Sequence, residues 1–226
     1  MLIQFLGNYT DYDRRSYALK VLLNASSYFK VEFAERGVMD ILLDILNNPK
    51  ENPLDLREHA VNIISNICQD CRQNQKEFRR KNGVELIKEN LMFKEVEQSG
   101  NVSTFLLGVL DCLNNAIFGN KRSELHFLDI EGIYVLLDLL EECEPCLKRL
   151  VLSSLCTILE NSKSFQYFVE WNSSKTRINA TQLLISLYVK EDERFGVNSE
   201  GGCLQGVARP LFPLTSYYVR KEEVPE

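Results

Sequence analysis

The chain has 226 residues, of which 45% are apolar and 26% charged, and its formal net charge is −6. This apolar content lies far from the composition of disordered chains. The negative charge argues against a nucleic-acid partner, because neutralising phosphates needs surplus lysine and arginine. The longest apolar stretch, residues 105–110, is far shorter than the ~20 residues of a membrane span, and residues 1–10 lack a secretory pattern. We therefore expect a soluble cytoplasmic protein without a membrane partner.

The first predicted element is a long helix that begins at about residue 14. Its apolar residues Leu19, Leu22 and Leu23 recur at helical spacing. No other helix is predicted before it, so the first two helices of this unit are missing.

A complete unit can be predicted between residues 54 and 91. Apolar residues at steps of three and four place one stripe on a long helix over about 54–70. A short helix over 75–81 follows. Asn82 and Gly83 end it, because both residues tolerate the left-handed conformation that closes helices. The apolar run that begins at Val84 then predicts a helix of medium length.

The order long, short, medium recurs twice. Leucines between 106 and 113 predict a long helix, residues 127–128 anchor a short one, and Gly132 opens a medium one. The next set covers 152–159, 165–169 and 183–187, and it lacks the glycine. From about residue 192, glycine and proline predict an irregular tail.

Two markers recur with a period in the forties. Asparagines near the ends of the long helices are spaced by 42, 49 and 46 residues, and glycines that open apolar runs are spaced by 46 and 49. These residues are Asn24, Asn66, Asn115 and Asn161, and Gly37, Gly83 and Gly132. Such a period is typical of armadillo and HEAT arrays. The sequence thus predicts an all-α, armadillo/HEAT-like α-solenoid of about four three-helix repeats.

The expected array covers residues 1–191, followed by an irregular tail over 192–226. Its units are a partial one at 11–28, then 29–70, 74–118 and 122–160, and a terminal one at 163–191. Terminal repeats normally carry a polar outer face, which the opening helix lacks. We expect the N-terminal end to pack against further repeats or a partner, as a piece of a longer array would. Alternatively, residues 1–10 fold back as a cap.

The four asparagines are candidate binding residues. In armadillo repeats the long third helices line the concave face, and one asparagine per repeat presents its amide to an extended peptide. Asn24, Asn66, Asn115 and Asn161 stand at the matching positions of the Leu-x-Asn segment. The alternative is that each asparagine ends its helix by bonding local carbonyl groups. Both interpretations can hold in different repeats.

No pattern in the sequence predicts catalysis. The pairs Cys68/Cys71 and Cys143/Cys146 lie more than one repeat apart, which disfavours a four-cysteine zinc site. The two histidines have no partner at a catalytic spacing. We therefore expect no enzyme activity, no cofactor and no metal, and we expect reduced thiols.

Charged residues gather in two places. Arg72, Lys76, Arg79, Arg80 and Lys81 lie on one short helix, whereas Glu141, Glu142 and Glu144 lie in the following repeat. Each run is either a solvated face or a docking site, and for the basic run the partner would be acidic, as tubulin surfaces are.

The C-terminal half resembles a known family. The segment from Asp129 to Leu140, then Trp171, then residues 183–187 and 209–212, resembles the later armadillo region of the cilia- and flagella-associated protein 69 family in order and spacing. The resemblance covers about residues 105–213 and is weaker upstream.

This resemblance implies a non-enzymatic scaffold of the axonemal central apparatus that supports ciliary or sperm motility. Its partners would be central-apparatus proteins and tubulin, and its location the axoneme and cytoskeleton of a cilium or flagellum. It implies no catalytic residue. The alternative is a soluble cytoplasmic adaptor that binds an extended peptide along the asparagine row.

Overall fold

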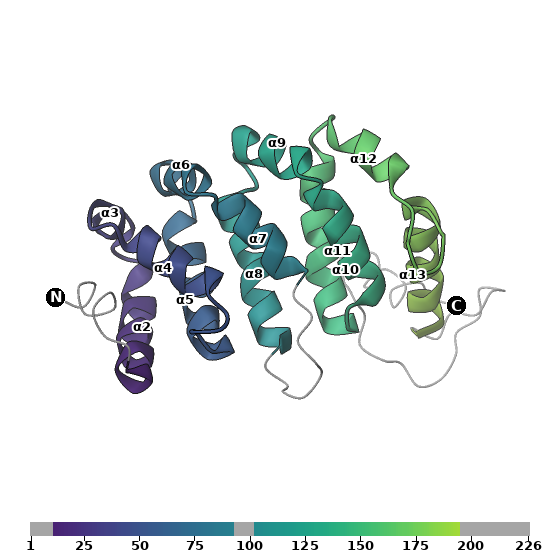
Figure 1. Cartoon of the computed structure of the whole chain (residues 1–226). Coiled ribbons are helices and arrows are strands. Elements are labelled where there is room, and N and C mark those ends of the chain that lie inside the picture. The colour runs from purple at the N-terminus through teal and green to yellow at the C-terminus, as the bar shows by residue number, and fades with distance from the viewer. Residues whose placement is uncertain (1–10, 93–101, 195–226) are drawn as a thin grey trace, which may run out of the picture.

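The computed structural model describes residues 11–92 and 102–194, and this part of the chain folds into helices without strands (Figure 1). The helices are α2 (Tyr12–Ser26), α3 (Lys30–Glu35), α4 (Val38–Asn47), α5 (Leu54–Cys68), α6 (Arg72–Arg80), α7 (Gly83–Leu91), α8 (Val102–Ala116), α9 (Lys121–Asp129), α10 (Gly132–Glu142), α11 (Pro145–Leu159), α12 (Ser164–Glu170) and α13 (Ala180–Arg194).

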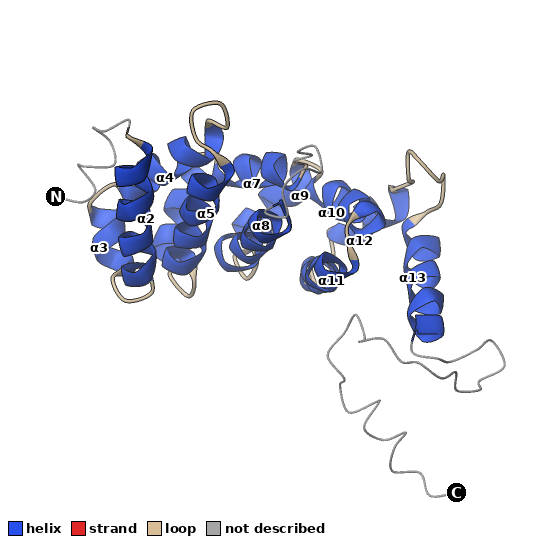
Figure 2. Ribbon diagram, turned by 90° about the horizontal axis from the view of Figure 1, so that it is seen from below, coloured by secondary structure: helices blue, strands red, loops and turns tan. Residues whose placement is uncertain are grey.

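The helices stack in the order that the sequence predicts. The long helices α2, α5, α8 and α11 form one row, in which each helix packs against the next. The medium helices α4, α7 and α10 form a second row beside them, drawn above the long helices in Figure 2. The short helices α3, α6, α9 and α12 lie along one edge (Figure 1). Because each set contacts its neighbours, the described chain is an α-solenoid, which confirms the predicted fold class.

One core runs through the whole stack. The stripe predicted on the long helix of residues 54–70 is fully buried, with Ile63, Ile64 and Ile67 at 0% exposure. The corresponding residues of α8, Cys112, Leu113 and Ala116, are equally buried. The long helices therefore share their apolar faces, and the burial of these side chains is the main stabilising contribution to each contact between repeats.

A phenylalanine packs onto a glycine at the corner between each central short helix and its medium helix. A Cβ atom built on Gly83 would lie 2.4 Å from the ring of Phe78, and one on Gly132 would lie 2.4 Å from the ring of Phe127. Both rings are completely buried. Glycine is thus required at these positions by close approach, because any side chain would collide with the ring.

The residue that turns the chain at each corner has a left-handed conformation. It is Asn82 with φ +59° and Glu131 with φ +62°, each just before the glycine. In the first unit Gly37 itself has φ +68°. Gly37 therefore corresponds to Asn82 and Glu131, and Val38 takes the place of Gly83. The glycine marker that appears regular in the sequence combines two structural positions, one residue apart.

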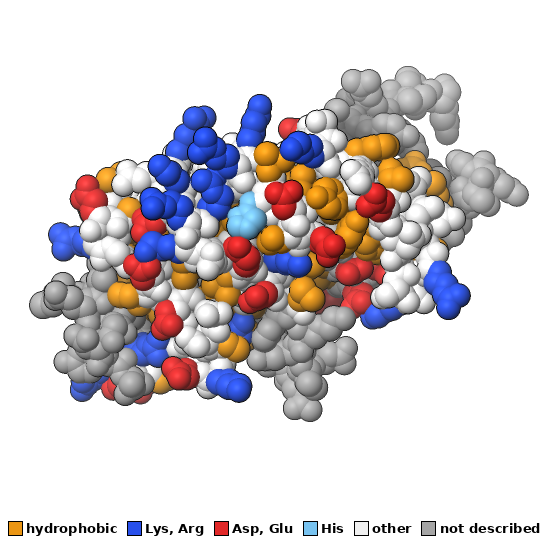
Figure 3. All heavy atoms as spheres, turned by 45° about the horizontal axis from the view of Figure 1, so that its top comes forward, with side chains coloured by type: hydrophobic (Ala, Val, Ile, Leu, Met, Phe, Trp, Pro, Cys, Tyr) orange, Lys and Arg blue, Asp and Glu red, His pale blue; other side chains and the backbone are white. Residues whose placement is uncertain are grey.

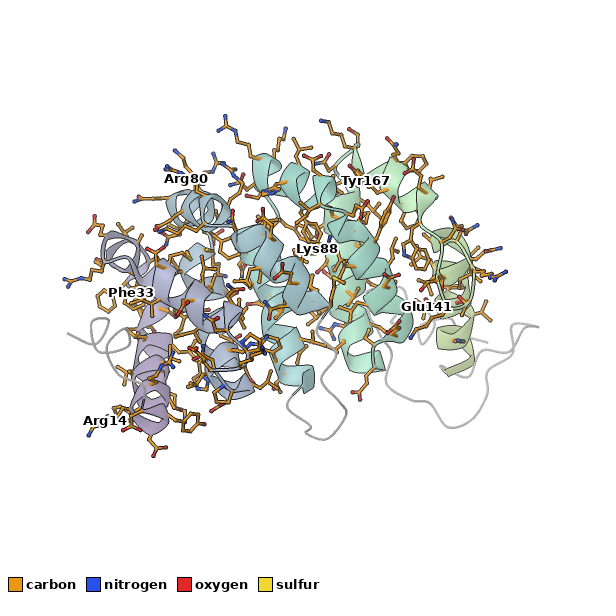
Figure 4. The ribbon with its side chains drawn as sticks, viewed as in Figure 1. Arg14, Phe33, Arg80, Lys88, Glu141 and Tyr167 are labelled. Carbon is orange, nitrogen blue, oxygen red and sulfur yellow. The ribbon has the colours of Figure 1, made fainter. Side chains whose placement is uncertain are left out.

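The last unit has a different corner. Residues 171–179 form a loop closed by a bridge between Asn172 and Asn179. Its Ser173 and Thr176 donate hydrogen bonds to Glu141 at the end of α10, with Oγ–Oε distances of 2.6–2.9 Å. Figure 4 shows Glu141 between α10 and the last unit. In the last unit, hydrogen bonds from this loop to Glu141 take the place of the contact between phenylalanine and glycine.

Several expectations lie outside the described residues, namely the cap formed by residues 1–10, the tail from residue 195 onward and the segment 209–212 of the family resemblance. Helix α13 continues to Arg194, past the predicted tail start at residue 192. The unit boundaries remain predictions.

Substitution of Gly132 by alanine tests the corner. Alanine has the better helix propensity by roughly 1 kcal/mol, yet the new methyl group must displace the buried Phe127 ring. We expect the free energy of unfolding to fall by about 1–3 kcal/mol, measured by urea denaturation. Adding Phe127→Leu should reduce the penalty in a double-mutant cycle. A more stable Gly132→Ala variant would contradict the close approach.

Candidate functional site

Two of the four candidate asparagines join neighbouring long helices. Asn66 Nδ2 on α5 donates to Ser26 Oγ on α2 at 2.8 Å. Asn115 Nδ2 on α8 donates to Ser65 Oγ on α5, also at 2.8 Å. These amides therefore hold adjacent repeats in register. They do not bond the carbonyl groups of their own helix ends, which was the alternative interpretation.

A carboxylate completes the second of these bridges. Ser65 Oγ donates to Asp111 Oδ2, and Asn115 Nδ2 lies 3.3 Å from the same oxygen. One repeat further along the row, Ser154 Oγ of α11 donates to Asn114 Oδ1 of α8 at 3.3 Å. A ladder of serine–asparagine contacts thus follows the row of long helices from α2 to α11.

The other two candidates have different surroundings. Asn24 is exposed and makes no hydrogen bond with any described residue. Asn161 lies after the end of α11, where its Nδ2 donates to Glu124 Oε2 at 3.2 Å and its Oδ1 accepts from the Lys163 backbone N–H at 3.2 Å. Its carbonyl oxygen also accepts from Ser164. Asn161 therefore joins the turn after α11 to α9, whereas the alternative interpretation expected its side chain to bond local carbonyl groups.

The amides of the row differ in what they can offer a ligand. Within the described chain, Asn66 and Asn115 use donors for the ladder, while their Oδ1 atoms accept no hydrogen bond. Asn24 keeps both groups. The face can therefore present acceptors at α5 and α8, and a full amide at α2, to the backbone N–H groups of an extended chain.

Two residues of α6, Asn74 and Gln75, join helices together, and the sequence analysis did not predict this role. Asn74 Nδ2 donates to the carbonyl oxygens of Lys30 and Ile67 at 2.9 and 2.7 Å. Gln75 Nε2 donates to those of Cys68 and Asn115 at 3.2 and 2.9 Å. Helix ends leave such carbonyls unsatisfied, so this pair of amides links α6 to α3, α5 and α8. Both residues lie about one helical turn before Phe78, on the side of α6 that faces the core. This spacing is the sequence signal that could have identified them.

Little in the described chain points to catalysis. His59 Nδ1 contacts the carbonyl oxygen of Asp55 one turn earlier, and His126 Nε2 lies 3.0 Å from Glu85 Oε1. No group of three or more His, Cys, Asp or Glu side chains is arranged to hold a metal within residues 11–92 and 102–194. Over the same ranges, no helix combines the length and apolarity that a membrane span requires.

Buried thiols are inert for a physical reason. Burial raises the pKa of Cys68 and of Cys112 well above the ordinary range, because the thiolate would lose its hydration. Both side chains are 0% exposed and pack in the core between α5 and α8. They act as small apolar residues.

A shallow depression of about 450 Å³ lies between α4 and α7. Leu43 and Leu86 form its apolar part, and Asp44, Glu85, Glu89 and Lys81 contribute charges. Its lining has no hydroxyl, thiol or imidazole group, and the Lys81 amine in it bonds Asp40, which raises the pKa of Lys81 and keeps the amine protonated.

The two charge clusters differ in their contacts. In the acidic one, Glu141 accepts from the loop of the last unit, and Glu142 Oε1 pairs with Lys175 Nζ at 2.7 Å. These two carboxylates therefore have a structural use. The basic cluster lies on the short-helix edge, where Figure 3 shows lysine and arginine side chains gathered at the upper left.

The fold and the surfaces together define an armadillo-type α-solenoid whose candidate sites are faces for other proteins. A family model described as cilia- and flagella-associated protein 69, ARM repeat, matches residues 15–225. The chain belongs to this family.

Individual relatives agree with that assignment. Cilia- and flagella-associated protein 69 of Mus musculus is 27% identical over 235 aligned residues, and that of Homo sapiens is 26% identical over 235. Each alignment covers 97% of this chain and 24% of the relative, so the chain spans about a quarter of the relatives' length. The match extends well beyond the half where the sequence analysis found its strongest resemblance.

A crystal structure of an engineered protein has a similar fold. The two chains superpose with a TM-score of 0.60 at 16% sequence identity, and the superposition covers 82% of this chain and 76% of the engineered one. At this identity the likeness concerns the fold alone.

The serine of the ladder can be tested directly. Ser65→Ala removes the hydroxyl that joins Asp111 and Asn115, and leaves their polar atoms without this partner. We expect the free energy of unfolding to fall by about 1–2 kcal/mol, measured by urea denaturation. Ser153→Ala, at an exposed position of α11, is the matched control and should change it by less than about 0.5 kcal/mol. Equal effects at the two positions would contradict a bridging role.

Proposed function

We propose that this chain is part of a non-enzymatic armadillo scaffold of motile cilia or flagella, and that it serves the axonemal central apparatus in ciliary or sperm motility. Its membership of the cilia- and flagella-associated protein 69 family carries the proposal. The relatives are about four times longer than this chain. The assembly of a whole relative is therefore proposed here only as the context in which this chain acts. The partners would be central-apparatus proteins and tubulin.

The surface chemistry supports a scaffold. Helical solenoids offer extended faces built from many repeats, and such faces suit long contacts with other proteins. The contacts of the two histidines, the raised pKa of Cys68 and Cys112, and a depression without hydroxyl, thiol or imidazole groups all favour binding over catalysis.

The location can be tested in a motile ciliated cell. The full chain with a fluorescent tag should concentrate along the cilia, in the position of the central pair, whereas the tag alone should stay in the cell body. Imaging with an axonemal tubulin marker measures this. A diffuse cytosolic signal from the tagged chain would contradict the proposal.

A second candidate function is a cytoplasmic adaptor that grips an extended peptide along the long-helix face. The amide of Asn24 and the Oδ1 atoms of Asn66 and Asn115, which make no hydrogen bond in the part of the chain that the structure describes, favour it. Asn161 would have to exchange its bonds with Glu124 and Lys163 before it could join the row.

Asn24 allows a clean test, since its side chain is exposed and makes no hydrogen bond with residues 11–92 or 102–194. For a peptide selected from a display library on the wild-type chain, Asn24→Ala should weaken binding by about 1 kcal/mol or more without changing the melting temperature. Asn66→Ala and Asn115→Ala should weaken it as well, at some cost in stability. Calorimetric titration measures the affinity. Unchanged affinity in all three variants would remove the adaptor hypothesis.

A further inference from the structure

Helix α6 carries a stripe of four cations on its outer side. Arg72, Lys76, Arg79 and Arg80 are spaced by four, seven and eight residues from the first, which places them on one face of the nine-residue helix. Three of them are exposed and Arg79 is partly so. Figure 4 shows Arg80 on the outer edge of the stack. We call these four residues the basic stripe.

The opposite side of α6 is fixed to the rest of the solenoid. Phe78 is completely buried and packs onto Gly83. Asn74 and Gln75 donate to carbonyl groups of three other helices or their ends. The basic stripe is therefore presented on a rigid platform, and a ligand would lose little free energy in ordering its backbone.

The cations of the stripe have no carboxylate partner within the described chain. The nearby carboxylates Asp40 and Glu77 both pair with Lys81, just beyond the end of α6. Like charges four residues apart on a helix repel each other by roughly 0.2–0.5 kcal/mol per pair. The stripe thus lowers the stability of α6, and a bound anion would relieve that repulsion.

Two further cations continue the same edge. Lys121 and Arg122 are exposed in the first turn of α9. This helix begins six residues after Asn115, whose carbonyl oxygen accepts from Gln75 of α6. Neither pairs with a carboxylate of the described chain. The edge therefore gathers positive charge in a protein whose net charge is −6, as the view of this edge shows (Figure 3).

We propose that the basic stripe, with Lys121 and Arg122, docks a glutamate-rich extended segment of a partner protein. Cations four residues apart on a helix are separated by about 6 Å along its axis. Side chains at alternate positions of an extended peptide are about 6.6–7 Å apart. Alternate glutamates can therefore meet successive cations of the stripe.

The surroundings favour a narrow chain over a larger polyanion. Asp40 and Glu77 lie beside the stripe through their contacts with Lys81, and Glu32 and Glu35 are exposed on the adjoining α3. A nucleic-acid duplex or an anionic membrane is wider than a single helix and would meet these carboxylates. A single extended peptide can follow α6 and avoid them.

The test uses fluorescence anisotropy with a short labelled peptide of alternating glutamate and glycine. The wild-type chain should bind this peptide, and binding should weaken as salt rises toward about 0.15 M because the contacts are exposed. A peptide of alternating glutamine and glycine should not bind. The triple variant Arg72→Gln/Lys76→Gln/Arg80→Gln should lose about tenfold in affinity, as three exposed ion pairs are lost.

A matched control removes the same charge elsewhere. Lys20→Gln/Lys50→Gln/Lys190→Gln takes three exposed lysines from other parts of the surface and should keep the affinity within about twofold. Equal losses in the two triple variants would reduce the effect to net charge and overturn the proposal. So would the absence of binding to the wild-type chain.

Two other ligands and a second variant complete the design. A single-stranded oligonucleotide or a phosphatidylserine vesicle that bound more tightly than the peptide, and lost binding in the stripe variant, would overturn the peptide in favour of that partner. The variant Arg72→Lys/Arg79→Lys/Arg80→Lys preserves the charge and should retain binding. It tests the basic stripe even if the glutamine variant fails to fold. These assays use the isolated chain, so their outcome is independent of its location in a cell.

Discussion

The close approach of a phenylalanine ring to a glycine backbone determines how the two central units of this solenoid are built. At Phe78–Gly83 and Phe127–Gly132 the ring fills the volume where a side chain would begin, and the left-handed residue before the glycine reverses the chain. The short helix is thereby fixed against the medium one, and α6 and α9 come to lie along one edge. Both the asparagine row and the basic stripe depend on this corner, because it determines which faces the long and short helices present.

The helices of the fold were predictable because burial leaves a strong trace in sequence. The stripe of Ile63, Ile64 and Ile67 predicted α5 to within two residues of its end, since a helix that packs on two neighbours must be apolar at steps of three and four. The corner was predictable only in part. Gly37, Gly83 and Gly132 look equivalent in sequence, but the first supplies the positive φ and the others the space for a ring. Periodicity detects the glycine and not the physical reason for it.

The candidate site was less predictable because asparagine can make the same bonds locally or between repeats. The spacing of Asn66 and Asn115 placed them correctly on the long helices. Their partners Ser26, Ser65 and Asp111 could be found only once the helices were side by side. The same holds for Asn74, whose acceptors lie seven residues and forty-four residues away. Contacts between repeats depend on lateral register, and a helical pattern contains no information about register.

The two candidate surfaces, the long-helix face and the short-helix edge, lie on different helices. Contacts between long helices hold the array together through the core and the ladder, so side chains that face outward there are restricted by stability. The short-helix edge contributes buried anchors such as Phe78 and Gln75 on one side only, which leaves its outer side free to vary in charge. That freedom explains how a chain of net charge −6 can carry, on a single helix, four cations that have no carboxylate partner among the described residues. A ligand on this edge and a ligand on the long-helix face would contact different elements, so one array can hold two partners at once.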